Sequence, residues 1–249
     1  MSSVPLPFHI VVALVATIAG GIASVAGFGI GSLLTPLVAS HYGMKTAVSA
    51  VAVPHLIATA LRFWKLRSDV DWRVFLGFGL MNALWSLAGA LFHVWVNNPA
   101  LGMILGILLA FAGVLGLLGY SERMRFGRTT SWIAGGLSGA LGGLVGNQGG
   151  IRSAAMLGIG VEGPAFVATT TAIGIAVDVV RVPVYVATES AQIINAWSVV
   201  LVSVTGVILG TLAGERVLRK IPEKLLRRVV SAVLLVVGVY LLLTMSSEP

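Results

Sequence analysis

The chain has 249 residues, of which 57% are hydrophobic and only 10% are charged, and its mean hydropathy is +0.98. Soluble proteins carry about a quarter of their residues as Asp, Glu, Lys or Arg, so this composition excludes a soluble enzyme, a nucleic-acid-binding module and a disordered chain. The apolar segments run unbroken instead of alternating at every second residue, which excludes an outer-membrane barrel. We therefore predict an all-α, polytopic membrane protein that resides in the lipid bilayer.

Residue types that bind metals or form covalent intermediates are scarce. The chain has no cysteine, which excludes disulfides, thiol catalysis and iron–sulfur clusters. Its four histidines are far apart in the sequence and no HExxH motif occurs, which argues against a metal site. Because no catalytic triad or carboxylate pair is found, we expect neither enzyme activity nor a cofactor. His55 is interpreted as a helix contact and not as a proton relay.

The first apolar segment covers residues 8–40 and contains no Asp, Glu, Lys or Arg. It is too long for one crossing of a hydrocarbon core of about 30 Å, because an α-helix rises about 1.5 Å per residue. Gly27, Gly29 and Gly31 interrupt the segment near its middle. The segment is therefore predicted to form a hairpin that is broken at these glycines.

Lys and Arg are concentrated in three short segments, and these indicate the topology. Short loops rich in Lys and Arg stay on the cytoplasmic side of the membrane. Between the first and second basic segments, two apolar spans, 74–95 and 100–120, meet at a turn over 97–99, so the chain returns to the side it left. The cytoplasmic loops are expected at residues 62–73, 123–128 and 216–228.

Three apolar segments, 131–159, 163–187 and 193–214, separate the second and third basic loops. Three single crossings would place the last loop outside, so one segment must fold back. The first of them would extend over about 40 Å as one helix, and glycines interrupt it between Gly142 and Gly150. We predict a second glycine-broken hairpin there. The alternative is an eight-pass bundle with two unbroken long helices, which violates the charge rule at one loop.

The two halves of the chain resemble each other. Gly27, Gly31 and Arg62 recur 119 residues later as Gly146, Gly150 and Arg181, and Trp72 recurs 125 residues later as Trp197. Each half is then a glycine-broken hairpin followed by three transmembrane helices, and an odd number of crossings gives the halves opposite orientations. Many secondary transporters are built from such inverted-topology repeats, with the site near the midplane at the broken helices. The predicted repeats are residues 1–122 and 123–249.

The two glycine breaks are the predicted substrate site. Helices that stop inside the bilayer have terminal N–H groups without intrahelical partners, and helix N-termini carry partial positive charge, so a break can hold an anion. Arg152 lies in an otherwise apolar arm and is interpreted as an oxyanion ligand or as a structural partner of Asp178 or Glu162. The predicted ligands at the breaks are Gly27, Gly29, Gly31, Asn147, Gln148, Gly149, Gly150 and Arg152.

Other polar residues inside the spans complete the candidate site. Arg181 follows Asp178 by three residues, so one alternative is a salt bridge between the two side chains. The other is that Arg181 binds the anion and Asp178 acts as the coupling group. Arg62 either guides anions or extends to the membrane interface. Thr169 and Thr170 either line a polar path or bond back to their own helix. Asp178 is the candidate for proton coupling.

Several of these segments resemble the TauE/SafE family of anion permeases. The motifs that carry the resemblance are the two breaks, Gly27 to Pro36 and Gly146 to Arg152; the helix starts Ala47-Val48-Ser49 and Val167-Ala168-Thr169-Thr170; the segment Val70-Asp71-Trp72; and the small residues Ala88-Gly89 and Gly206, Gly210 and Gly214. The resemblance implies a secondary transporter of the inner membrane that exports sulfite, a sulfonate or a related sulfur-containing or carboxylate anion.

The sequence leaves several questions about transport open. An anion channel and a non-transporting membrane subunit are the alternatives to a transporter. Protons and sodium are the candidate coupling ions, and a second copy of the chain is the candidate partner in a homo-oligomer.

Overall fold

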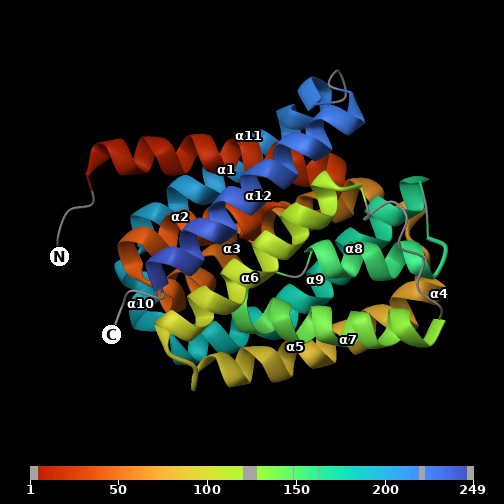
Figure 1. The fold of residues 1–249 in the computed structure, drawn as a ribbon, viewed down its shortest axis with the longest axis horizontal. Coiled ribbons are helices and arrows are strands. Elements are labelled where there is room, and N and C mark those ends of the chain that lie inside the picture. Colours follow the sequence, from red (N-terminus) through yellow and green to blue (C-terminus); the bar gives the residue numbers. More distant parts are fainter. Residues whose placement is uncertain (1–4, 120–127, 148, 162, 219–221, 246–249) are drawn as a thin grey trace.

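The computed structural model describes residues 5–119, 128–147, 149–161, 163–218 and 222–245, and these are helical with no strand among them (Figure 1). By length and composition, six of the described helices can cross a membrane, and a further apolar helical stretch, Arg228–Thr244, is shorter. An all-α, multi-pass membrane protein, as predicted from composition, is confirmed.

The predicted breaks lie where helices end in the structure. The first half contains α1 (Leu6–Ala26), α2 (Ile30–Tyr42), α3 (Met44–Leu66), η1 (Arg67–Asp69), α4 (Trp72–Val74), the π-helical η2 (Phe75–Gly79), α5 (Leu80–His93) and α6 (Asn98–Leu117). The second half contains α7 (Arg128–Val145), α8 (Gly149–Gly158), α9 (Gly163–Thr188), α10 (Ser190–Asn195), α11 (Trp197–Leu218) and α12 (Glu223–Met245). Both long apolar segments are therefore pairs of helices, α1 with α2 and α7 with α8.

Glycine is required at the ends of these paired helices. Gly27 ends α1 in the left-handed region with φ +77°, and Gly29 precedes α2 with φ +133°. Gly146 follows α7 with φ +72°. Residues with a Cβ atom rarely adopt these dihedral angles, so glycine allows the chain to turn within a few residues.

Two helix pairs pack with their backbones in contact. A Cβ atom on Gly210 of α11 would lie 1.9 Å from the carbonyl oxygen of Thr17 in α1, and one on Gly143 of α7 would lie 1.9 Å from that of Ser86 in α5. Small residues at such interfaces let helices approach closely in lipid. Figure 1 shows α5 and α7 side by side along one edge of the bundle, with α1 along the opposite edge.

Helices at matching positions in the two halves make matching contacts with the other half. The hairpin helix α1 of the first half packs along α11 of the second, and the hairpin helix α7 of the second packs along α5 of the first. In each pair, the numbers of the residues that contact each other increase in the same direction along both helices, so the two helices are parallel. The third helices of the two halves, α3 and α9, run antiparallel to each other, and so do the last ones, α6 and α12.

Candidate functional site

The two glycine breaks contact each other at the centre of the fold. A Cβ atom on Gly31 would lie 2.4 Å from the carbonyl oxygen of Gly146, and one on Gly149 would lie 2.3 Å from Cβ of Phe28. The Ser32 hydroxyl also donates to Oδ1 of Asn147, at 3.2 Å. The backbone of each break therefore packs against the other without room for a side chain.

A small cavity, the central pocket, lies where the breaks meet. Its volume is about 10 Å³, enough for one water molecule. Residues of both breaks line this cavity, together with His55 of α3 and Arg152 of α8. The lining residues are Phe28, Gly29, Gly31, Ser32, His55, Gly146, Asn147, Gly149 and Arg152.

Arg152 gives the central pocket its charge. Its side chain belongs to a residue that is only 2% exposed, and its Nε and Nη1 atoms have no hydrogen-bond partner among the described residues. Burying an ionised group without partners is costly, so such a group indicates an absent ligand or water. Helix α2 begins at this pocket, and no side chain caps its first backbone N–H groups. These groups and the guanidinium suit an anion.

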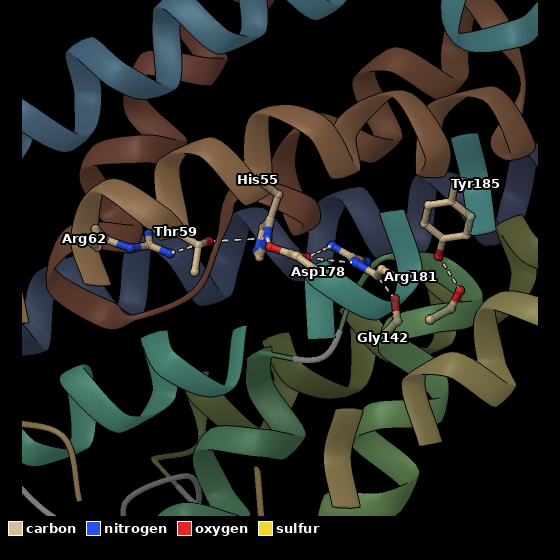
Figure 2. A network of polar contacts seen from close by, with 8 residues as sticks. His55, Thr59, Arg62, Gly142, Asp178, Arg181 and Tyr185 are labelled. Carbon is tan, nitrogen blue, oxygen red and sulfur yellow. Dashed lines mark hydrogen bonds and ion pairs between the residues drawn. The ribbon is translucent and has the colours of Figure 1, made fainter. Parts of the chain in front are cut away.

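A chain of polar contacts runs beside the central pocket between α3 and α9 (Figure 2). His55 Nδ1 lies 2.6 Å from Oδ2 of Asp178. Arg181 donates from Nε to Oδ1 of the same carboxylate at 2.9 Å, and its Nη2 forms an ion pair with that oxygen at 2.8 Å. Thr59 Oγ1 lies 3.5 Å from His55 Nδ1 and accepts a hydrogen bond from Nη2 of Arg62 at 3.2 Å. The Asp178 carboxylate thus holds two side chains from two helices.

The same chain stabilises the end of α7 at the second break. The last four carbonyl groups of a helix have no intrahelical donor. Arg181 Nη1 donates to the carbonyl of Gly142 at 2.8 Å, the Tyr185 hydroxyl donates to that of Gly143, and His93 Nδ1 donates to that of Leu144 at 2.7 Å. Since Arg181 contacts both Asp178 and α7, its guanidinium positions the second break. Of the two alternatives for Asp178 and Arg181 that the sequence left open, the salt bridge is present.

The remaining predicted ligands have different surroundings. Thr169 accepts a hydrogen bond from the backbone N–H of Asp71 at 2.9 Å, so it positions the start of α4 and does not line the central pocket. Thr170 lies against the first break, where a Cβ on Gly27 would be 3.4 Å from its methyl group. Gly150 lies in α8. Gln148, and Glu162 as a partner of Arg152, lie outside the described residues.

Several site residues were not selected from the sequence. These are Ser32, His55, Thr59 and Tyr185, which the structure places in the central pocket or in the polar chain. The signal was helical spacing, because residues three, four or seven apart lie on one face of a helix. His55, Thr59 and Arg62 follow this spacing on α3, and so do Asp178, Arg181 and Tyr185 on α9.

A model of the sulfite exporter TauE/SafE family matches residues 12–241, nearly the whole chain. The protein belongs to the TauE/SafE family. Comparisons with curated proteins and with solved structures gave no match. Membership, together with the apolar helices, identifies a multi-pass membrane transporter of the sulfite-exporter type and confirms the resemblance noted in the sequence.

Proposed function

We propose that the protein exports a small oxyanion across the cytoplasmic membrane, and that Arg152 binds this anion in the central pocket. The substrate is sulfite, a sulfonate or a related sulfur-containing or carboxylate anion. The observation that carries the proposal is the buried Arg152 guanidinium, whose Nε and Nη1 have no partner among the described residues and which faces the glycine breaks. Family membership supports the substrate class.

Each part of the central pocket has a role in binding. Arg152 provides a planar pair of donors that matches two oxygens of an oxyanion. The glycines let backbone N–H groups approach the anion, and Asn147 adds a side-chain amide. With a volume of about 10 Å³ the pocket is closed around one water, so a sulfite ion enters only when the two breaks move apart.

Alternating access follows from two inverted repeats, residues 1–122 and 123–249. Antiparallel packing of the equivalent helices, α3 with α9 and α6 with α12, supports this relation. So does the exchange of hairpin contacts, α1 with α11 and α7 with α5. In this proposal the halves rock against each other, with the basic loops cytoplasmic.

Asp178 is the proposed coupling group, and the coupling ion is a proton. Asp178 bonds to His55, and His55 lines the central pocket in which the anion binds. Three cations, Arg62, Arg152 and Arg181, surround this pair. An anion that binds among them offsets their repulsion of a further positive charge, so it favours proton uptake by the His55–Asp178 pair.

The test of the proposal is sulfite flux in proteoliposomes that contain the purified protein or its Arg152→Gln variant. A hydrogen bond to a charged group contributes about 1.5–3 kcal/mol, so flux at low sulfite should fall by about tenfold or more. Arg67→Gln is the matched control, since Arg67 stacks on Trp64 at 3.9 Å at the surface. Unchanged kinetics in the Arg152 variant would contradict the assignment. Sulfite current without coupling would indicate a channel, and flux only with a co-purified protein would indicate a subunit.

A further inference from the structure

A second cavity, which we call the vestibule, lies where α1 and α3 end and α9 begins, beside α11. Its volume is about 550 Å³, within the range of sites for small molecules and far larger than the central pocket. The residues that carry the argument are Ser24, Arg62, Lys65, Asp69, Val167 and Thr211. Nothing in the proposed function assigns a ligand to this cavity.

Arg62 is the buried charge of the vestibule. The residue is 4% exposed, and its Nε and Nη1 atoms have no hydrogen-bond partner among the described residues. The Thr211 hydroxyl, in a residue that is 2% exposed, also has no partner there. Two cations, Arg62 and Lys65, and one carboxylate, Asp69, give the lining a net charge of +1. The cavity therefore favours an anion.

The repeat partner of Arg62 shows why this guanidinium is unsatisfied. Arg181 has Asp178 three residues before it, and the carboxylate accepts a hydrogen bond from its Nε and forms an ion pair with its Nη2. Arg62 has Thr59 at the equivalent place, and the hydroxyl accepts one bond and brings no negative charge. The second half thus has an internal anion for its arginine, whereas the first half leaves the corresponding charge open to a ligand.

We propose that the vestibule is a second anion site, in which a small hydrated oxyanion binds to Arg62 before it passes to Arg152. This inference rests on the proposed function, since it adds a loading step to the same transport path. Size separates the two sites, because the vestibule has room for an anion with bound water and the closed central pocket does not. The contacts from Arg62 through Thr59 to His55 lead from the vestibule to the central pocket.

The first experiment measures equilibrium binding of sulfite to purified protein that carries Arg152→Gln, so that the central ligand is absent. Binding should remain, and adding Arg62→Gln should weaken it by about tenfold or more. Adding Arg67→Gln removes the same charge from the same end of α3 outside the cavity, and should change the affinity less than about twofold. Equal losses from the two additions, or no loss from Arg62→Gln, would overturn the proposal.

The second experiment keeps Arg62 and changes its neighbour. Thr59→Asp gives the first half the carboxylate that Asp178 supplies to the second, so the new internal anion should displace sulfite and weaken its binding about tenfold. Thr59→Asn is the control, because Asn has nearly the same size as Asp without the charge, so it should weaken sulfite binding much less than Thr59→Asp does. Sulfite binding that is equal in the two variants would contradict an anion site at Arg62.

The two proposals fail in different ways. Absence of sulfite flux through the wild-type protein in proteoliposomes would overturn the proposed function. Normal wild-type flux, together with an Arg62→Gln variant whose half-saturating sulfite concentration on the vestibule side is unchanged, would overturn only the vestibule site. Size-exclusion profiles and thermal unfolding of each variant in detergent show whether it folds.

Discussion

Gly31→Ala tests whether the two glycine breaks must touch. The added Cβ would lie 2.4 Å from the carbonyl oxygen of Gly146, whereas real Cβ atoms essentially never approach closer than 3.0 Å, so one break must move by about 0.6 Å or more. The obstacle is backbone and cannot change rotamer. Because Gly31 lies in the first turn of α2 and Gly146 directly follows the end of α7, the shift displaces both sides of the central pocket.

The expected cost follows from overpacking. Extra methyl groups in well-packed interiors destabilise proteins by about 1–3 kcal/mol, and a rigid contact between two backbones belongs at the upper end. The assay is thermal unfolding of the purified protein in detergent, together with sulfite flux in proteoliposomes. We expect Gly31→Ala to lower the unfolding temperature and to reduce flux by more than the loss of folded protein explains.

Ser32→Ala is the matched control at the next residue. It removes the hydrogen bond to Asn147 without adding volume, and a neutral hydrogen bond contributes only about 0.5–1.5 kcal/mol. The reasoning is refuted if Gly31→Ala retains wild-type stability and flux, or if Ser32→Ala is the more damaging change. Either result would mean that the breaks are not in contact in the working protein.

Two further predictions concern the polar chain and the topology. Asp178→Asn removes the carboxylate that binds His55 and Arg181, so it should destabilise the protein by about 3–5 kcal/mol in thermal unfolding. It should also abolish the proton uptake that is coupled to sulfite flux. Preserved proton coupling in this variant would exclude Asp178 as the coupling group. Since the chain has no cysteine, the exposed Ser68 and Ser190 can each be replaced by Cys and treated with a membrane-impermeant maleimide in intact cells, where Ser190→Cys should react and Ser68→Cys should not. Reaction of both would contradict the proposed orientation.

The helix ends at the two breaks were predictable because they follow from the length of the apolar segments and from the position of glycine. An apolar segment that is too long for one crossing must end or fold back, and the glycines mark where α1 and α7 end. The contact between the breaks was only a hypothesis, since residues more than a hundred positions apart carry no local signal of proximity. The structure brings Gly31 and Gly146 together through packing alone.

The roles of the charged residues depended on partners that the sequence does not specify. Arg152 and Arg181 are both arginines within apolar segments. Arg152, however, has donors without a partner in the described part of the chain, whereas Arg181 binds a carboxylate and the end of α7. The sequence carries no sign of the polar partner of His55, because that partner, Asp178, lies on another helix. A charge inside a membrane indicates a site, but only the geometry separates a ligand from a support.

The different partners of Arg62 and Arg181 bear on the direction of transport. If the halves exchange conformations, Arg181 keeps its internal anion in every state, because Asp178 is three residues away on the same helix. Among the described residues no carboxylate bonds to Arg62, so a bound substrate supplies a counter-charge there. The mouth beside the basic loop over residues 62–73 then binds the oxyanion more tightly than the opposite mouth. Unequal affinity cannot drive net flux by itself, because it leaves the free-energy difference of the anion across the membrane unchanged. It does favour capture at low concentration from the side of the basic loops and release on the other side, which is the arrangement that export requires.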